Sequence, residues 1–233
     1  MIRQSLTVEP PVLTPVIPPL EPGDHLTRDE FERRYDAMPD LKKAELIEGV
    51  VYMASPVRFE KHGQPHVIVS FWLASYLTKT PFVEAGDNVS VRLDGKNMPQ
   101  PDVAMIITPS KGGQARLSED DYVEGAPELI VEVAAGTASM DLNTKFHVYR
   151  RNKVQEYVVW PVLDGVVDWF SLENGEYRRL VADDEGIIRS RIFPGLWLDP
   201  AALIAFDFAS VLDTVQRGMS DPSHAAFVAK LQA

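Results

Sequence analysis

The chain has 233 residues, of which 45% are hydrophobic, and it contains no cysteine. This length supports one domain with a substantial core, and the absence of cysteine excludes disulfides and thiolate metal sites. The formal net charge of −11 opposes nonspecific nucleic-acid binding by the whole surface, although it leaves room for a local basic groove.

Residues 1–23 are rich in proline and predict an extended N-terminal arm. This segment lacks the apolar core and cleavage pattern of a signal peptide, and the chain has no long uncharged apolar stretch. We therefore expect a cytoplasmic protein that makes no membrane contact. We also expect a main domain over residues 24–200 and a C-terminal helical extension over residues 201–233.

The first half of the chain predicts alternating helices and strands. Thr27, followed three residues later by Glu30, forms a capping box and predicts a short helix that ends near Ala37. A strand interrupted by Gly49 is expected over residues 45–53. The pattern then predicts a helix over 62–79, a strand or bent hairpin over 82–93, and hydrophobic strands at 102–107 and 128–135. The loop over residues 108–127 is long, polar and expected to be functional or mobile.

The second half predicts a helix followed by antiparallel strands. Apolar residues at spacings of three and four indicate a helix over residues 141–151. Strands are expected at 156–160, 166–172 and 177–181, with type I′ hairpin turns at Asp164-Gly165 and Asn174-Gly175. Weaker helical patterns occupy residues 199–233.

Glu132 is the most informative residue, because it lies inside an apolar run that predicts a strand buried on both faces. An ionised carboxylate without a partner is costly there, so Glu132 needs a metal ion, a cation or a proton. Asp102 opens a second apolar strand. Two acids on two hydrophobic strands indicate a divalent-metal site at one end of a sheet.

Lys145, on the helix that follows the strand of Glu132, can approach these carboxylates. It also lies four residues after Asp141, and the simpler interpretation is an exposed helical ion pair worth a few tenths of a kcal/mol. The alternative is an ammonium group that takes part in catalysis.

Other candidates are weaker. His62 and His66 have the spacing of a helical metal pair, but Gly63 and Pro65 disturb the helix and no third ligand is evident, so zinc is disfavoured. Basic side chains near the predicted site could contact phosphates or form a solvated face. These are Lys111, Arg116, Lys145, Arg150, Arg151 and Lys153.

Several segments, in this order and spacing, carry a resemblance to a known family. They are residues 45–56 (ELIEGVVYMASP), His62, 91–93 (VRL), 100–103 (QPDV), 126–133 (APELIVEV), 141–145 (DLNTK) and 156–161 (EYVVWP). The chain resembles the Uma-type putative restriction endonuclease family, within the PD-(D/E)XK nuclease superfamily, over about residues 27–200. The resemblance implies an α/β, restriction-endonuclease-like fold: a mixed β-sheet flanked by helices, here with extra antiparallel hairpin strands.

The resemblance also implies the roles of individual residues. Asp102 matches the PD element and Glu132 the (D/E) element, whereas Ala134 occupies the usual position of the lysine. In this family the following helix supplies that lysine, here Lys145, and Glu45 matches an additional acid of the metal shell.

The implied activity is a Mg²⁺-dependent endodeoxyribonuclease, in which Mn²⁺ can substitute for Mg²⁺. Asp102, Glu132 and Glu45 would be metal ligands together with the carbonyl of Val133, while His62 and Tyr149 match positions near the site. DNA is the expected partner, and a homodimer is expected only by analogy.

Two alternatives remain at this point. The chain could be a catalytically inactive nuclease-fold module that binds protein or nucleic acid, for which the acidic balance and the proline-rich arm argue. It could also be an inert fold in which an arginine holds Glu132 in a buried ion pair.

Overall fold

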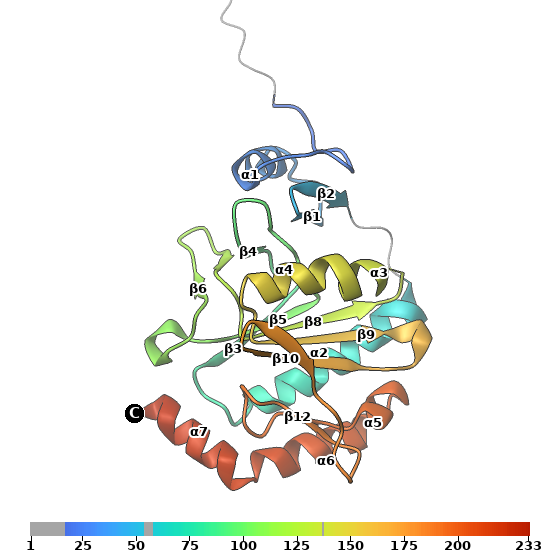
Figure 1. Ribbon diagram of the computed structural model, residues 1–233, viewed down its shortest axis with the longest axis vertical. Helices are drawn as coiled ribbons and strands as arrows, with labels where there is room; N and C mark the ends of the chain where they lie inside the picture. The colour runs from blue at the N-terminus through green and yellow to red at the C-terminus, as the bar shows by residue number, and fades with distance from the viewer. Residues whose placement is uncertain (1–16, 54–57, 137) are drawn as a thin grey trace, which may run out of the picture.

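The protein, seen in a computed structural model that describes residues 17–53, 58–136 and 138–233, is built around one mixed sheet (Figure 1). The six-stranded sheet has the order β11-β10-β9-β8-β5-β3. Its strands are β3 (Val83–Asp87), β5 (Val103–Ile107), β8 (Leu129–Ala134), β9 (Glu156–Pro161), β10 (Asp168–Glu173) and β11 (Glu176–Arg179). Only β8 and β9 pair in parallel among these strands. The predicted strands at 102–107 and 128–135 are therefore confirmed as central neighbours.

Helices cover both faces of this sheet (Figure 1). On one face lies α2 (Gln64–Leu77), which packs with the side chains of Leu129, Val131 and Val133. On the other lies a continuous helical segment made of α3 (Ala138–Met140), a π-helical turn η3 (Asp141–Lys145) and α4 (Phe146–Arg151). Because successive side chains of a strand point to opposite faces, Ile130, Glu132 and Ala134 all point toward this second segment.

The C-terminal helices form a further layer outside α2 (Figure 1). They are α5 (Pro200–Ile204), α6 (Phe208–Met219) and α7 (Pro222–Gln232). Val211, Val215 and Leu231 from these helices join the same apolar core as α2. No helix in the described part of the chain is long and apolar enough to cross a membrane.

The N-terminal part adds a helix and a hairpin beside the sheet. Helix α1 (Arg28–Asp36) begins where the capping box predicts, with the Thr27 hydroxyl accepting a hydrogen bond from the Glu30 amide. The predicted single strand over 45–53 is wrong, because the segment folds as a hairpin of β1 (Ala44–Ile47) and β2 (Val50–Met53). Glu48 and Gly49 make its turn in the left-handed region, with φ of 53° and 78°.

Two further predictions need correction, one of a strand or hairpin and one of a turn. Residues 82–93 are neither one strand nor a hairpin: β3 joins the central sheet, whereas β4 (Val91–Arg92) pairs with β7 (Val123–Glu124) in a small separate sheet completed by β6 (Arg116–Leu117). Asp164 ends a 3₁₀ turn, η4 (Val162–Asp164), so Asp164-Gly165 is not a type I′ turn. Asn174-Gly175 is confirmed, with φ of 51° and 82° between β10 and β11.

The remaining elements are short. They are the π-helical turn η1 (Phe59–Gly63), the 3₁₀ turn η2 (Pro109–Lys111), and the paired strands β12 (Ile188–Arg189) and β13 (Trp197–Leu198). Residues 1–16 of the predicted proline-rich arm lie outside the described residues. Leu20, near its end, is buried against α1 in a small apolar cluster. The predicted division into arm, main domain and extension stays a prediction.

Glu156 is a fully buried acid that ties β9 to the segment before β13. Its carboxylate accepts hydrogen bonds from the Ser190 hydroxyl (2.7 Å), the Arg191 amide (2.7 Å) and the Trp169 indole (3.2 Å). Burial, opposed by these hydrogen bonds, raises the pKa of Glu156 to about 7. Between pH 4.5, the ordinary pKa of a glutamate, and about pH 7, the folded protein therefore keeps the proton on Glu156, whereas the unfolded chain releases it.

We predict that the free energy of unfolding falls as the pH rises from 5 to 8, and that Glu156→Gln weakens this fall by about 3 kcal/mol. The reason is that glutamine cannot ionise, whereas the folded Glu156 holds its proton more tightly than the unfolded one. Denaturant unfolding of both proteins at pH 5 and pH 8 measures the difference. Parallel pH profiles for the two proteins would contradict the raised pKa.

Candidate active site

The pairing of β5 with β8 brings two acids together at the end of the sheet. Val103 pairs with Val131 in antiparallel register, and the same register carried one residue further places Asp102 opposite Glu132. Both residues are buried, with 3% and 4% of their surfaces exposed. The sequence prediction that these acids meet at one sheet end agrees with their positions.

The following helical segment supplies a cation to this pair. The Lys145 ammonium lies 2.9 Å from Glu132 Oε1, and the Tyr149 hydroxyl donates to the same oxygen at 2.8 Å. Lys145 is 3% exposed and lies on the π-helical turn η3, a feature that is frequent at functional sites. The interpretation of Lys145 as an exposed surface lysine is therefore wrong.

Glu45 reaches the same ammonium from β1. Its Oε1 lies 2.9 Å from Lys145 Nζ and accepts a hydrogen bond from the Gln100 amide at 2.8 Å. A bridge between Leu46 and Met98 holds the hairpin beside the segment that leads into β5. Glu48, which the hairpin turn carries, is exposed and pairs with Arg151 away from the acids.

Asp102 is oriented by the backbone of β8. The Val133 amide donates to Asp102 Oδ2 at 2.7 Å, which fixes the carboxylate. The other oxygen, Oδ1, faces His62 Nε2 at 3.5 Å and Lys43 Nζ at 3.7 Å, both beyond ordinary hydrogen-bond length. This oxygen is therefore the more available one for a ligand.

His62 also lies on a π-helical turn, η1, which comes directly before α2. Its Nδ1 lies 3.1 Å from the Val133 carbonyl, which can only accept, so Nδ1 donates there and Nε2 faces Asp102. His66 stacks on His62 at 5.7 Å but bonds to Asp87, at 2.9 Å. His66 Nε2 also lies 3.2 Å from the Asp102 carbonyl oxygen, so both histidines pack against Asp102.

Three acids near Lys145, namely Glu132, Glu45 and Asp141, set its charge state, and Asp102 adds to the effect on Glu132. Burial, together with Asp141, Asp102 and Glu45 and against the effect of Lys145, raises the pKa of Glu132 to about 8. Burial alone would lower the pKa of Lys145, but Glu132, Glu45 and Asp141 raise it well above its ordinary value. Lys145 is therefore a permanent cation, and at least one acid of the cluster binds a proton more readily than usual.

A cavity of about 780 Å³ opens onto this cluster. Its lining combines acids, cations and histidines from the hairpin, η1, α2, β3, β8 and η3 and from the residues directly before the hairpin, η1 and β5. The charged and imidazole side chains are Lys43, Glu45, Arg58, Lys61, His62, His66, Asp87, Asp102, Glu132 and Lys145. Asp102, Glu132, Glu45, Val133, His62 and Lys145 thus share one cavity, and Tyr149 lies behind Glu132.

The side chains can be tested for their fit to a divalent metal. Within residues 17–53, 58–136 and 138–233, no three histidine, aspartate or glutamate side chains are placed to share a metal ion directly. Lys145 lies between Glu45 and Glu132, where a shared metal would otherwise lie. Mg²⁺, however, usually takes only one or two carboxylates and keeps several waters. The oxygens of Asp102 and Glu132, with the Val133 carbonyl, fit that requirement.

Comparison with known proteins identifies the family. A model of the Uma2 family, described as "Putative restriction endonuclease", matches residues 28–201. The chain belongs to the Uma2 family. No curated protein sequence matches it.

A solved structure shows the same fold. The chain is similar to a crystal structure from Anabaena variabilis ATCC 29413, described as a putative nuclease belonging to DUF820, with a TM-score of 0.58 and 15% identity. The alignment covers 77% of this chain and 99% of that chain. This likeness, with the mixed sheet and its flanking helices, confirms the predicted fold class.

The structure gives two residues near the cluster a setting that the sequence did not show. Asp141 is 2% exposed and lies 3.6 Å from Lys145, so this pair is buried rather than superficial. Lys43, two residues before Glu45, lines the cavity and donates to Asn88 at 3.0 Å. Alternation along β1 could have placed Lys43 and Glu45 on one face, but the sequence alone did not show that the face borders Asp102.

Most of the basic residues proposed from sequence lie elsewhere. Only Lys145 of that group lines the cavity. Arg116 pairs with Glu124, Arg150 with Glu176, and Lys111 lies over the ring of Phe82. The idea that an arginine holds Glu132 is also wrong, because its cationic partner is Lys145.

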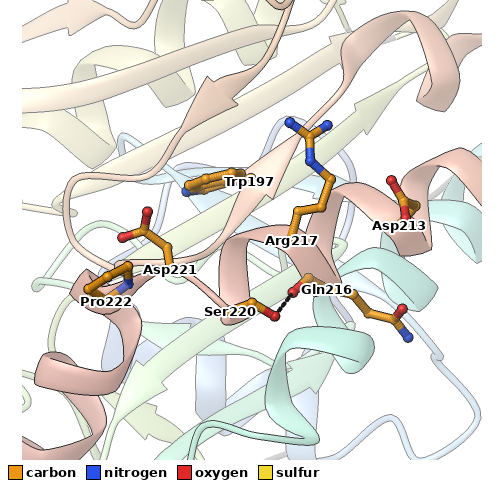
Figure 2. A pocket seen from close by; sticks show the side chains of 7 residues that line it. All are labelled: Trp197, Asp213, Gln216, Arg217, Ser220, Asp221 and Pro222. Atoms are coloured by element: carbon orange, nitrogen blue, oxygen red, sulfur yellow. Dashed lines mark hydrogen bonds between the residues drawn. The ribbon is translucent and has the colours of Figure 1, made fainter.

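A second hollow, of about 520 Å³, lies between β13 and the helices α6 and α7. Figure 2 shows the seven side chains that line it, with its two acids, Asp213 and Asp221, at opposite ends. Neither acid is buried, and Arg217, the cation between them in Figure 2, is exposed and pairs with Glu185 instead. This hollow therefore lacks the convergent, desolvated groups that mark the first cavity as the candidate site.

We predict that Lys145→Met lowers the free energy of unfolding by about 3–5 kcal/mol, because it leaves buried acids without their cation. Adding Glu132→Gln should recover part of that loss, since it removes one of the acids left uncompensated. Denaturant unfolding of the wild type, both single variants and the double variant closes a double-mutant cycle.

Lys230→Met, on the exposed face of α7, is the matched control and should change stability by no more than about 0.5 kcal/mol. Strict additivity of the two substitutions would show that Lys145 and Glu132 do not interact as the 2.9 Å contact requires.

Proposed function

We propose that this protein is a Mg²⁺-dependent endonuclease that hydrolyses phosphodiester bonds in DNA. The observation that carries the proposal is the convergence of Asp102, Glu132, Glu45 and Lys145 in one cavity of a Uma2-family chain. A fold of this kind without a function has no reason to bury four charged groups at one sheet end, since each is costly to desolvate. The similar Anabaena protein, described as a putative nuclease, supports the same class of activity.

The proposed metal ligands are Asp102 and Glu132, with the Val133 carbonyl, and with Glu45 direct or through water. Mn²⁺ is expected to substitute, because it accepts the same oxygen ligands. When bound, Mg²⁺ would supply positive charge that stabilises the phosphoryl oxygens during hydrolysis. The Val133 amide holds Asp102 so that Oδ1 stays available in the cavity.

Lys145 has the role of a fixed cation in this proposal. Its raised pKa means that it keeps its proton at neutral pH, so it does not serve as a general base. Its ammonium instead offsets the charge of Glu45 and Glu132 and adds to the positive potential that a phosphate meets in the cavity.

His62 has a complementary role. Its Nδ1–H is committed to the Val133 carbonyl, which leaves Nε2 free to accept a proton from a water molecule in the cavity. The same hydrogen bond fixes the imidazole beside Asp102 Oδ1. His62 therefore positions the end of β8 and offers a proton acceptor that Lys145 does not.

We predict that the purified protein nicks supercoiled plasmid DNA in the presence of Mg²⁺ or Mn²⁺, and that Asp102→Ala reduces this rate by at least about a hundredfold. The reason is the loss of the carboxylate oxygen that faces the cavity. Nicking is followed by gel electrophoresis, with Asp102→Ala purified in parallel to expose any contaminating nuclease.

Equal nicking by wild type and Asp102→Ala would refute the site. If neither protein cleaves plasmid, single-stranded DNA or RNA, calorimetric titration with Mn²⁺ decides between two functions. Binding by the wild type alone supports a metal site that needs a specific substrate. No binding by either protein favours the catalytically inactive module that binds protein or nucleic acid.

A further inference from the structure

The cavity has opposite charges at its floor and at its edge. Its floor carries Asp102, Glu132 and the buried Lys145, whereas its edge carries Lys43, Arg58 and Lys61. Arg58 and Lys61 are exposed and Lys43 is half-buried, so all three can meet a ligand from solvent. We call Lys43, Arg58 and Lys61 the basic rim.

Arg58 lines the cavity and has no acidic partner in the described part of the chain. Almost every arginine in the described part of the chain takes part in an ion pair. Within those described ranges, Arg58 and Arg178 are the two without a carboxylate inside salt-bridge distance, and Lys61 likewise has none. In a chain with a net charge of −11, unpaired cations beside a cavity are available for an anionic ligand.

Lys43 is the member of the rim closest to the acids. Its ammonium donates to Asn88 at 3.0 Å and lies 3.7 Å from Asp102 Oδ1. Its side chain is 26% exposed, against 3% for Lys145, whose ammonium is already held between two carboxylates. Lys43 can therefore contact a phosphate from solvent, which the enclosed Lys145 cannot do without leaving Glu45 and Glu132.

We propose that the basic rim binds the phosphodiester backbone of a nucleic acid, with Lys43 at the phosphate next to the acidic floor and with Arg58 and Lys61 at flanking phosphates. The proposal rests on the proposed function for the identity of the ligand, but it concerns binding rather than hydrolysis. A chain of phosphates fits better than a single anion, because three separate cations line the cavity and only Lys43 lies beside the acids. The guanidinium of Arg58 can also bind a phosphate in bidentate fashion.

The test compares two triple variants with the same change in charge. One is Lys43→Ala/Arg58→Ala/Lys61→Ala, which removes the rim. The control is Lys42→Ala/Arg178→Ala/Lys230→Ala, which removes three exposed cations that do not line the cavity. None of the six residues is buried, so both variants should keep the wild-type circular dichroism and melting temperature.

Binding is measured by fluorescence anisotropy in EDTA with short labelled single-stranded DNA, duplex DNA and RNA, over a range of salt concentrations. We expect the rim variant to bind on the order of tenfold or more weakly than the control, and to lose about two to three charges from the salt dependence of binding. In metal-dependent cleavage, the rim variant should raise KM and leave kcat within about threefold. The reason is that the rim contacts would stabilise the bound substrate and the transition state equally. The three probes separate the possible sources of the backbone.

Equal affinities and salt slopes for the two triple variants would overturn the proposed binding role of the rim, because the loss of affinity would then reflect total charge alone. Absence of wild-type binding to every probe would overturn it as well. Binding that depends on the rim, without cleavage of any probe, would retain the rim and reject the proposed nuclease activity. A loss confined to kcat would show that these cations act on the chemical step and contradict a binding role.

Discussion

The cost of burying Glu132 and Asp102 is the constraint on which the arrangement of this protein depends. These acids face each other at the end of β5 and β8 and are almost fully buried, so water reaches them only through the cavity and compensates their charge weakly. The compensation comes from Lys145 on η3, which contacts Glu132, and from the Val133 amide on β8, which donates to Asp102. His62 on η1 lies beside Asp102. The hairpin, the central sheet and both flanking helical layers are thus tied to one cluster of charges.

The sequence predicted the elements well where local chemistry decides the structure. Thr27 starts α1, and Asn174-Gly175 makes a type I′ turn, because capping and left-handed turn residues act over a few positions. The turn at Glu48-Gly49 was missed for a local reason, because glutamate rarely adopts the left-handed region that it has here. The prediction also failed where the outcome depends on distant partners. Residues 82–93 divide between two sheets because β4 finds β7, far along the chain.

The site could be predicted in part for a similar reason. An acid inside an apolar strand is unusual enough to indicate Asp102 and Glu132, and the family resemblance added Glu45 and Lys145. Lys43 was missed because a lysine before a strand is ordinary, and only the tertiary fold places it beside Asp102. The burial of Lys145 was equally hidden, because an Asp141–Lys145 pair at helical spacing looks the same in sequence whether it is exposed or enclosed.

The position of Lys145 has a consequence for how the cluster can accept a metal. One ammonium offsets one charge, whereas three acids contact it and Asp102 lies beside Glu132, so the charge balance of the cluster is incomplete. A divalent cation beside Asp102 and Glu132 would complete that balance and lower the pKa of Glu132, so protons should leave when it binds. Since Lys145 keeps Glu45 and Glu132 in place before that event, the ammonium preorganises oxygens that would otherwise repel one another. On this argument the lysine and the metal are complementary charges in one cluster rather than competitors for it.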